Sequence, residues 1–472
     1  MRKTKIVCTI GPATESPEMI RKLILSGMNV ARLNTSHDTP EHHRERIRSI
    51  KSIRDELGIP VAILLDLSGP KLRTGMFKED IVSLHKGQQF FLTTEKIVGD
   101  SRGVSVNYSL LPREVKPEDI ILLNDGKVKL KVLETSETRI MTEVLNDADI
   151  THHRGINLPG IDLSIAAVTE KDEAYIKLGV EEGVDFFALS FVRKPEDVQK
   201  ARKIIVGCGA AVPIISKIET SQALSKINEI AEVSDGLMVA RGDLGVEIPV
   251  EEVPIAQKKI IKAGNRHRIP VITATQMLES MIENPTPTRA ETTDISNAIL
   301  DGTDAIMLSA ETSIGKYPIE AVCVMNKTAI STESYLQGNP HILQWTRRDV
   351  DTDDHTDAIC RAAWDISETL MVKLIVSSTY SGHTAINVSG FRPRSIILAV
   401  TPNNRTYYRL SLVWGVLPLY QEIGTSIDEM VETAGKKARE MELIKEGDHF
   451  IITAGVPLGV AHSTNMLKLE KA

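Results

Sequence analysis

Polar side chains stand at the end of one short apolar segment after another in this sequence. They are Arg32 with Asn34, Asp66, Ser190, Lys217 with Glu219, Arg241 with Asp243, Thr275, and Ser309 with Glu311. Each residue has a structural explanation on its own, as part of a salt bridge, a β-branched strand position or a helix cap. Their recurrence favours one shared catalytic site, because barrel enzymes carry their reactive groups at the carboxyl ends of the strands.

Two carboxylates in this set suit a metal ion. Glu219 and Asp243 follow neighbouring predicted strands, and hard divalent cations take oxygen ligands while keeping positions for water and substrate. Magnesium is therefore favoured over zinc. Gly242 and Gly245 place a turn at the same point, where backbone N–H groups can receive a carboxylate or a phosphate.

The cations of the set point to an anionic substrate. Lys217 lies in an apolar run, where a charged ammonium needs a partner, and it can neutralise charge on a transferring phosphoryl group or an enolate. Arg32 and Arg73 carry forked guanidinium groups that suit phosphate. The stretch LLDLSGPKLRTG also places Lys71 and Arg73 just after Asp66. This crowding indicates that the charged side chains bind a ligand at the end of the strand.

Eight short apolar runs rich in β-branched residues would position these side chains. The runs begin at Lys5, Asn29, Pro60, Val184, Val212, Gly236, Pro270 and Ala305, and most precede an amphipathic segment. Near-continuous apolar strands that alternate with helices are typical of parallel sheets buried on both faces. Eight such units predict an α/β fold with a (β/α)₈ TIM barrel.

Two further domains are predicted from changes in this pattern. The long interval between the third and fourth runs reads as alternating strands and turns, which predicts an all-β lid inserted after the third strand. After Tyr335 a polar linker leads to a second series of strands and helices, which predicts an open α/β C-terminal domain. The predicted boundaries are 1–75 and 154–340 for the barrel, 76–153 for the lid and 341–472 for the C-terminal domain.

Composition narrows the class of protein. The formal charge of −7 and the lack of basic runs with aromatic residues argue against nucleic-acid binding. The four cysteines are far apart and form no CxxC, which fits a reducing cytoplasm better than a disulfide framework or a thiolate zinc site. No apolar stretch approaches the ~18 residues of a membrane span, and the apolar run at the N-terminus is too short for a signal peptide.

Three other segments favour local interpretations. PTRAE predicts a capping box between Thr288 and Glu291. The pair His42-His43 lies in a charged helical segment and is interpreted as solvated rather than metal-binding. SSTYSGHTA, which begins at Ser377, leaves a strand and opens a helix as a phosphate cradle does, although serine and threonine helix caps have the same pattern.

These motifs together resemble the pyruvate kinase family. The matching segments are CTIGPAT, NVARLNTSH, LLDLSGPKLRTG, NDG, RGINLPG, SFVRK, IISKIET, MVARGDLGVE, TATQMLESM, PTRAE and IMLSAETSIGKYP, in the family's order across nearly the whole chain. The predicted domain plan matches as well. The resemblance implies phosphoryl transfer from phosphoenolpyruvate to ADP, which gives ATP and an enolpyruvate that is protonated to pyruvate, the last step of glycolysis. It also implies a cytoplasmic homotetramer.

The resemblance implies a role for each matching residue. Glu219 and Asp243 look like the ligands of Mg²⁺ or Mn²⁺, Lys217 resembles the lysine that stabilises the moving phosphoryl group and the enolate, and Arg32 resembles a phosphate clamp. The backbone turn that holds the substrate carboxylate corresponds to Ala240, Arg241 and Gly242, beside Asp243. Thr275 and Ser309 look like the relay that protonates enolpyruvate. Asn34, His37, Arg73 and Lys171 resemble the nucleotide-binding side.

Lys71 differs from the residue that potassium-dependent members of the family have at this position. Potassium-dependent members have glutamate at this position, and their potassium ion sits near the residues that match Asn34, Ser36, Asp66 and Leu67. The tethered ammonium of Lys71 can supply the positive charge of that ion, so we expect activity without potassium.

The resemblance also bears on regulation. SSTYSGHTA is similar to the loop that grips the phosphate of sugar-phosphate activators. The expected contacts of a phosphorylated effector are Ser377, Thr379, Ser381, Gly382 and Thr384.

Two alternative functions stay open at this point. An aldolase or lyase on the same barrel would use Lys217 to form a Schiff base with its substrate. A catalytically silent metabolite sensor would bind its ligand through the C-terminal domain. The carboxylate pair, the lid and a second anion-binding domain favour phosphoryl transfer over both.

Overall fold

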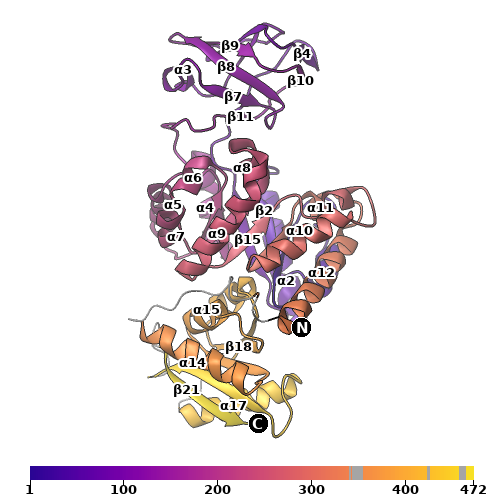
Figure 1. Cartoon of the computed structure of the whole chain (residues 1–472), viewed down its shortest axis with the longest axis vertical. Helices are drawn as coiled ribbons and strands as arrows, with labels where there is room; N and C mark the ends of the chain where they lie inside the picture. Colours follow the sequence, from indigo (N-terminus) through magenta and orange to yellow (C-terminus); the bar gives the residue numbers. More distant parts are fainter. Residues whose placement is uncertain (340–341, 343–353, 423–425, 457–463) are drawn as a thin grey trace.

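The computed structural model describes residues 1–339, 342, 354–422, 426–456 and 464–472. Figure 1 shows three units along the longest axis of the molecule, with the β-rich lid at one end, the barrel in the middle and the C-terminal sheet at the other end. Most of the predicted linker after Tyr335 lies outside the described residues.

Eight parallel strands close into the predicted barrel. They are β1 (Lys5–Thr9), β2 (Val30–Asn34), β3 (Ala62–Leu67), β12 (Phe186–Leu189), β13 (Ile214–Ile218), β14 (Gly236–Ala240), β15 (Val271–Ala274) and β16 (Ala305–Leu308). Their order around the barrel is β1-β16-β15-β14-β13-β12-β3-β2. All eight predicted runs are strands of this barrel, so the predicted fold class is confirmed.

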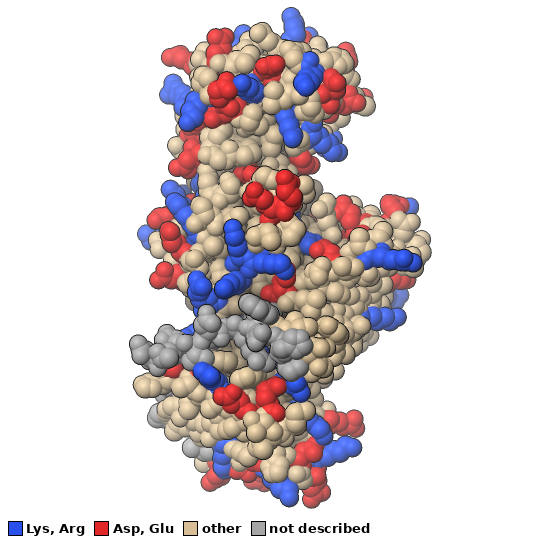
Figure 2. All heavy atoms as spheres, viewed as in Figure 1, with Lys and Arg blue, Asp and Glu red and all other residues tan. Residues whose placement is uncertain are grey.

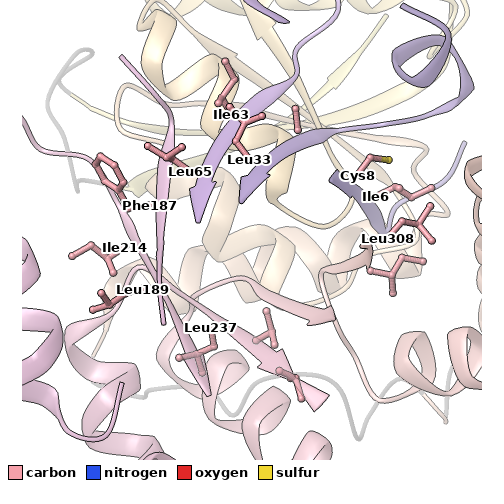
Figure 3. Close-up of a cluster of buried hydrophobic side chains, with 14 of the residues drawn as sticks. Ile6, Cys8, Leu33, Ile63, Leu65, Phe187, Leu189, Ile214, Leu237 and Leu308 are labelled. Carbon is pink, nitrogen blue, oxygen red and sulfur yellow. The ribbon is translucent and has the colours of Figure 1, made fainter. Parts of the chain in front are cut away.

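Alternate residues of these strands pack into two separate hydrophobic layers. One layer lies between the strands and the surrounding helices and includes Ile6, Leu33 and Phe187 (Figure 3). The other layer fills the barrel interior, where Val7 and Leu64 are buried together with Leu412 of the C-terminal domain. Burial on both faces explains why the strand sequences are almost continuously apolar.

Helices surround the barrel and begin and end at recognisable signals. The main ones are α1 (Pro17–Ser26), α2 (Pro40–Leu57), α4 (Glu170–Glu181), α5 (Pro195–Gly207), α6 (Ser221–Ser225), α7 (Ile227–Val233), α8 (Arg241–Glu247), α9 (Val253–His267), α10 (Arg289–Leu300), α11 (Ala310–Ser313) and α12 (Pro318–Gly338). The predicted capping box of Thr288 and Glu291 is present at the start of α10. Short 3₁₀ turns span Val250–Glu252, Glu279–Ile282 and Leu410–Leu412.

The segment between β3 and α4 forms the inserted β-rich unit. A six-stranded sheet has the order β11 (Ile156–Asn157), β7 (Ile120–Leu123), β8 (Val128–Thr135), β9 (Arg139–Val144), β5 (Gln89–Thr93) and β6 (Gly103–Ser105). Strands β4 (Val82–Leu84) and β10 (Ala148–Ile150) pair separately, and the only helix described here is the short α3 (Leu111–Glu114). The unit has its own core around Phe90 and Val132.

The C-terminal unit is an open sheet with helices on it. Its order is β19 (Val416–Tyr420), β18 (Ile396–Thr401), β17 (Leu374–Ser378), β20 (His449–Gly455) and β21 (Thr464–Lys471). The first four are parallel strands of the predicted open α/β sheet, and β21 adds an antiparallel edge that the sequence did not reveal. The helices are α14 (His355–Thr369), α15 (His383–Gly390), α16 (Asn404–Arg409) and α17 (Ile427–Glu440).

The C-terminal unit contacts the amino end of the barrel. The backbone N–H of Gly415 donates to the carbonyl of Lys3 at 3.0 Å, and the buried Lys5 ammonium donates to the carbonyl of Val416 at 2.6 Å. The opposite, carboxyl end of the barrel is therefore the end that faces the lid.

The surface carries both signs of charge. On the face drawn in Figure 2, acidic and basic side chains occur over the lid, the barrel and the C-terminal unit alike. Among the described helices, none is long and apolar enough to cross a membrane.

Candidate active site

A cleft of about 450 Å³ opens between the lid and the carboxyl ends of the barrel strands. Its barrel side includes Arg32, Asn34, Ser36, Ser190, Lys217, Glu219 and Asp243. Its other walls come from Lys71 and Arg73, from residues 153–157 at the base of the lid, and from Asp125 on the turn between β7 and β8. The structure therefore brings most of the predicted strand-end residues into one cavity.

A buried ion network lies under this cleft, with Asp66 at its centre. One carboxylate oxygen of Asp66 accepts from Arg32 Nε at 2.7 Å, and the other lies 3.4 Å from Lys217 Nζ. Lys217 Nζ also lies 2.8 Å from Glu219 Oε1 and donates to the hydroxyl of Ser190 at 2.7 Å. Three neighbouring acceptors therefore fix the ammonium of Lys217.

The charges of this network control one another's pKa values. Burial would lower the pKa of Lys217, but Asp66, Glu219 and Asp243 together raise it above its ordinary value. Burial would raise the pKa of Asp66, yet Lys217 and Arg32 hold it below its usual range. Lys217 is consequently a fixed cation and Asp66 a fixed anion at neutral pH.

Glu219 and Asp243 provide an oxygen donor set that fits a divalent cation. The Glu219 carboxylate accepts from the backbone N–H of Phe191 at 2.9 Å. Burial first, and then the nearby charge of Asp243, raise the pKa of Glu219. The exposed Asp243 side chain lines the cleft, and its carboxylate makes no hydrogen bond among the described residues. A cation between these carboxylates would relieve their mutual repulsion.

The size of this donor set also fits magnesium. In the described part of the chain, no cluster of three or more histidine, cysteine, aspartate or glutamate side chains is placed to hold a metal. Two protein carboxylates are what Mg²⁺ commonly uses together with water and substrate phosphate.

The turn from β14 into α8 is tied to the end of β15. The Gly242 N–H donates to Thr275 Oγ1 at 2.9 Å, and Arg241 Nη2 donates to the carbonyl of Thr275 at 2.6 Å. Thr275 has a φ of 70°, which is a strained backbone conformation for a β-branched residue. Such strain persists only where its surroundings enforce it, and it is typical of functional sites.

Ser309 directly follows the neighbouring strand β16 and makes no hydrogen bond to Thr275. Its N–H donates to Glu311 Oε2 at 2.7 Å, and the same buried carboxylate accepts from the Leu278 N–H at 3.1 Å. Glu311 therefore serves the local backbone, and neither it nor Ser309 is among the residues that line the cleft.

Lys71 and Arg73 lie on the loop that connects β3 to the lid. Asn107 holds this loop by donating to the carbonyl of Lys71 and accepting from the N–H of Arg73, both at 2.8 Å. The Lys71 side chain has a large solvent-accessible surface, yet its ammonium lies inside the cleft and is partly withdrawn from water. This withdrawal, followed by the charges of Arg73 and Lys217, lowers the pKa of Lys71, whereas Asp243 and Asp66 oppose the change.

The four other predicted monovalent-cation positions are contiguous around β2 and β3. Asn34 is the register partner of Asp66, and the side chain of Asn34 accepts from the N–H of Ser36 at 3.1 Å. Leu67 follows Asp66 at the end of β3 and is buried. Lys71 lines the same cleft as Asn34 and Ser36.

The remaining predicted nucleotide residues meet at one edge of the barrel. Lys171 Nζ donates to the carbonyl of Thr35 at 2.9 Å, one residue after Asn34. The His37 side chain is exposed and lies on the same loop. His37 and Lys171 do not line the cleft itself, whereas Asn34 and Arg73 do.

The interpretation of His42-His43 as a solvated pair is wrong for His43. The His43 ring is fully buried and packs edge-on against Tyr175, with ring centroids 5.5 Å apart. His42 stays partly exposed, 3.1 Å from Glu15. The charged sequence of α2 conceals the face that packs against α4, because that contact depends on tertiary structure.

The predicted effector loop is present at the end of β17, but several of its hydroxyl groups serve the fold. Ser377 is bonded to Thr453 at 3.0 Å, and Thr384 to Thr464 at 2.8 Å. Thr379 Oγ1 accepts from the Gly382 N–H at 3.0 Å. Ser381 is the exposed member of the predicted set.

Glu247 is a cleft residue that sequence reasoning missed. Burial raises its pKa to about 7, although hydrogen bonds from Ser221 and Asn157 oppose the shift. It lies at the end of α8, four residues after Asp243, so the spacing RGDLGVE is the signal that could have placed both on one helix face.

Comparisons with known proteins agree with this architecture. The family model described as "Pyruvate kinase, barrel domain" matches residues 1–322, and the one described as "Pyruvate kinase, alpha/beta domain" matches residues 357–470. A pyruvate kinase from Thermotoga maritima is 51% identical over 471 residues and covers 100% of both chains. A pyruvate kinase from Staphylococcus saprophyticus is 46% identical, covering 100% of this chain and 80% of its own.

A solved structure gives the same result. A crystal structure of a pyruvate kinase from Cryptosporidium parvum has a TM-score of 0.93 and 36% sequence identity, and it covers 100% of this chain and 96% of its own. None of these similarities supports an aldolase or a silent sensor. The chain belongs to the pyruvate kinase family.

Proposed function

We propose that this chain transfers the phosphoryl group of phosphoenolpyruvate to ADP and forms pyruvate and ATP. The observation that carries the proposal is the buried ammonium of Lys217, held by Asp66, Glu219 and Ser190 at the floor of the cleft. A fixed cation at this place suits a reaction in which catalysis is mostly positioning and charge stabilisation.

Lys217 would stabilise both the moving phosphoryl group and the enolate that it leaves behind. Lys217 has three acceptors, of which only the Ser190 hydroxyl is neutral. Its hydrogen bond to Ser190 is therefore weaker than those to the two carboxylates, because hydrogen bonds between charged partners are stronger. We therefore expect a substrate oxygen to replace Ser190 and leave both carboxylates in place.

Arg32 would clamp the phosphate of phosphoenolpyruvate. Its Nε and Nη1 are committed to Asp66 and to the Thr9 hydroxyl, whereas Nη2 makes no hydrogen bond among the described residues. Because Arg32 lines the cleft, that free nitrogen is available to a substrate oxygen.

Glu219 and Asp243 would hold the divalent cation, with Mg²⁺ favoured and Mn²⁺ as a substitute. When bound, the cation would withdraw negative charge from phosphate and enol oxygens. Binding of Mn²⁺ to the free protein, followed by electron paramagnetic resonance, tests the ligands without any turnover. Glu219→Gln and Asp243→Asn should each weaken binding, and Glu251→Gln, a change on an exposed barrel residue, should not.

The carboxylate of phosphoenolpyruvate would lie against the backbone of Ala240, Arg241 and Gly242. The hydrogen bonds of the Arg241 side chain to Ala274, Gln257, Thr275 and Asp294 support this assignment, because they hold the turn in place. Thr275, with Ser309 on the next strand, would take part in protonating enolpyruvate.

Asn34, His37, Arg73 and Lys171 would bind ADP, and Lys71 would replace potassium. The place of Lys71 in the wall of the cleft that Asn34 and Ser36 also line supports the second assignment. With Mg²⁺ present, activity in a buffer whose only monovalent cations are bulky organic ones should equal activity in potassium chloride. A strong loss without potassium would refute the assignment.

Regulation and assembly are further parts of the proposal. A phosphorylated metabolite would bind near Ser381, and a phosphoenolpyruvate saturation curve that did not respond to fructose 1,6-bisphosphate, AMP or sugar monophosphates would count against this. We propose a homotetramer, which light scattering can test. The domain boundaries 75/76, 153/154 and 340/341 also stay predictions, testable by limited proteolysis.

A coupled assay tests the proposed reaction as a whole. Pyruvate should appear only when phosphoenolpyruvate, ADP and Mg²⁺ are all present, and lactate dehydrogenase with NADH reports its formation. Pyruvate formation that did not depend on ADP would contradict the proposal.

A further inference from the structure

The loop of residues 35–38 follows β2 and is fixed at both of its ends. At its start, the N–H and the hydroxyl of Thr35 both donate to the carbonyl of Asp66, at 3.0 and 2.9 Å. At its end, Asp38 has a φ of 66°, in the left-handed region that non-glycine residues seldom occupy. A backbone of this kind needs support from its surroundings.

Helix α2 supplies one support through His43. His43 Nε2 lies 2.9 Å from the carbonyl of His37, and because a carbonyl only accepts, this nitrogen must carry the proton. Burial lowers the pKa of His43, so the ring stays neutral. Its Nδ1 is buried without a hydrogen-bond partner among the described residues, a cost that an apolar side chain would avoid. The bond to His37 is thus the contribution that the imidazole makes.

Arg46 supplies a second support from the same helix. Its side chain is almost fully buried, with Nη1 donating to Asp38 Oδ2 at 2.6 Å and Nε donating to Glu15 Oε2 at 2.9 Å. The guanidinium thereby joins the residue of left-handed backbone to the loop between β1 and α1. The bond from Arg46 also holds the pKa of Asp38 below its ordinary value, so the pair stays charged.

Helix α4 closes the other side of the loop. Lys171 donates to the Thr35 carbonyl at 2.9 Å, and the Tyr175 hydroxyl donates to the Asp38 carbonyl at 3.3 Å. The backbone of the loop is therefore held from two helices, while the side chain of His37 is exposed. This arrangement presents the His37 side chain from a fixed backbone.

We propose that His43 and Arg46 are positioning residues that hold the 35–38 loop in the form that binds the phosphates of ADP. The proposal rests on the proposed nucleotide role of His37 and Lys171. Phosphoenolpyruvate would be bound by Arg32 and the Lys217 network, which neither positioning residue contacts. The two side chains should therefore set the affinity for ADP and leave that for phosphoenolpyruvate unchanged.

Steady-state kinetics of the full-length enzyme can separate the two affinities. His43→Leu and Arg46→Met should each raise KM for ADP about five- to tenfold, the effect of one lost ordering hydrogen bond, and change KM for phosphoenolpyruvate less than about twofold. His43→Gln can place an amide N–H where Nε2 lies and should restore KM for ADP. Arg44→Met is the matched control, because Arg44 pairs with Glu181 and Glu182 at the surface.

The outcomes distinguish this proposal from the one on which it rests. Melting temperatures identify variants that fold, and if His43→Leu does not fold, Arg46→Met still decides. Folded variants with unchanged KM for ADP, or with both KM values raised equally, would overturn the positioning role. If His37→Ala left KM for ADP unchanged in an enzyme that forms ATP, the nucleotide assignment would fail first.

Discussion

Replacing Lys217 by methionine would remove the ammonium that lies between Asp66, Glu219 and Ser190 while keeping most of the side-chain volume. At an effective dielectric constant of about 20, an ion pair at 2.8 or 3.4 Å corresponds to roughly 5 to 6 kcal/mol of attraction. A phosphoryl oxygen at hydrogen-bond distance would experience an attraction of the same order. A cation supplied to a phosphoryl transition state raises kcat about 10³- to 10⁵-fold.

We therefore expect Lys217→Met to lower kcat by about 10³-fold or more, equivalent to ~4 kcal/mol of transition-state stabilisation. Phosphoenolpyruvate should still bind, because Arg32 and the β14–α8 turn remain. The variant should also lose stability, at most about 3 to 5 kcal/mol, because one partner of a buried ion network is removed. Asp66 keeps Arg32 as a partner and Glu219 can take up a proton, so the loss should be at the lower end.

The assay combines stopped-time pyruvate formation with isothermal titration of phosphoenolpyruvate into each variant. Lys226→Met is the matched control, because Lys226 is exposed and lies outside the cleft. A folded Lys217→Met enzyme with more than about a tenth of the wild-type kcat would refute the role given to this ammonium.

Three other predictions follow from single side chains. Lys71→Glu should create a potassium requirement, so that the variant is active in potassium chloride and inactive when a bulky organic cation replaces potassium. Full activity under both conditions would contradict the proposal that the Lys71 ammonium replaces potassium. Thr275→Val, which keeps the β-branch, should lower kcat by about 10²-fold while Thr275→Ser stays near wild type, and deuterium incorporation into pyruvate would show whether protonation is the slowed step. Burial lowers the pKa of Lys5 to about 7 in the folded protein, and the unfolded chain therefore holds more protons between pH 7 and 10.5. Denaturant unfolding of the wild type should accordingly show that the free energy of unfolding rises by about 2 kcal/mol from pH 7 to 9. The Lys5→Met variant should lack this rise. The same dependence of the free energy of unfolding on pH in both proteins would contradict the prediction.

The barrel could be predicted from the sequence because its strands are buried on both faces. Apolar side chains recur without alternation in β3 and β12, and polar residues such as Asp66 and Lys217 follow at or near the strand ends. Parallel topology then places those ends at one side of the barrel, so the barrel side of the cleft followed from chain order and the barrel rule, whereas Glu247 and the lid residues of the cleft did not.

Tertiary contacts account for most of what the sequence did not reveal. His43 was hidden in a charged helix because its burial depends on Tyr175 of another helix. The left-handed backbone conformation at Thr275 could not be predicted, because the residue there is not a glycine. Strand β21 has the sequence TNMLKLEK and pairs with β20 alone, so it lacks the continuous apolar run of its neighbours.

Phosphorus-31 NMR of the complete reaction tests the central claim most directly. The account predicts that, with Mg²⁺ present, the phosphoenolpyruvate signal declines as the γ-phosphate signal of ATP grows in equal amount. It further predicts that Lys217→Met slows both changes together. Release of inorganic phosphate in place of ATP, or equal rates in the wild type and a folded Lys217→Met variant, would contradict it.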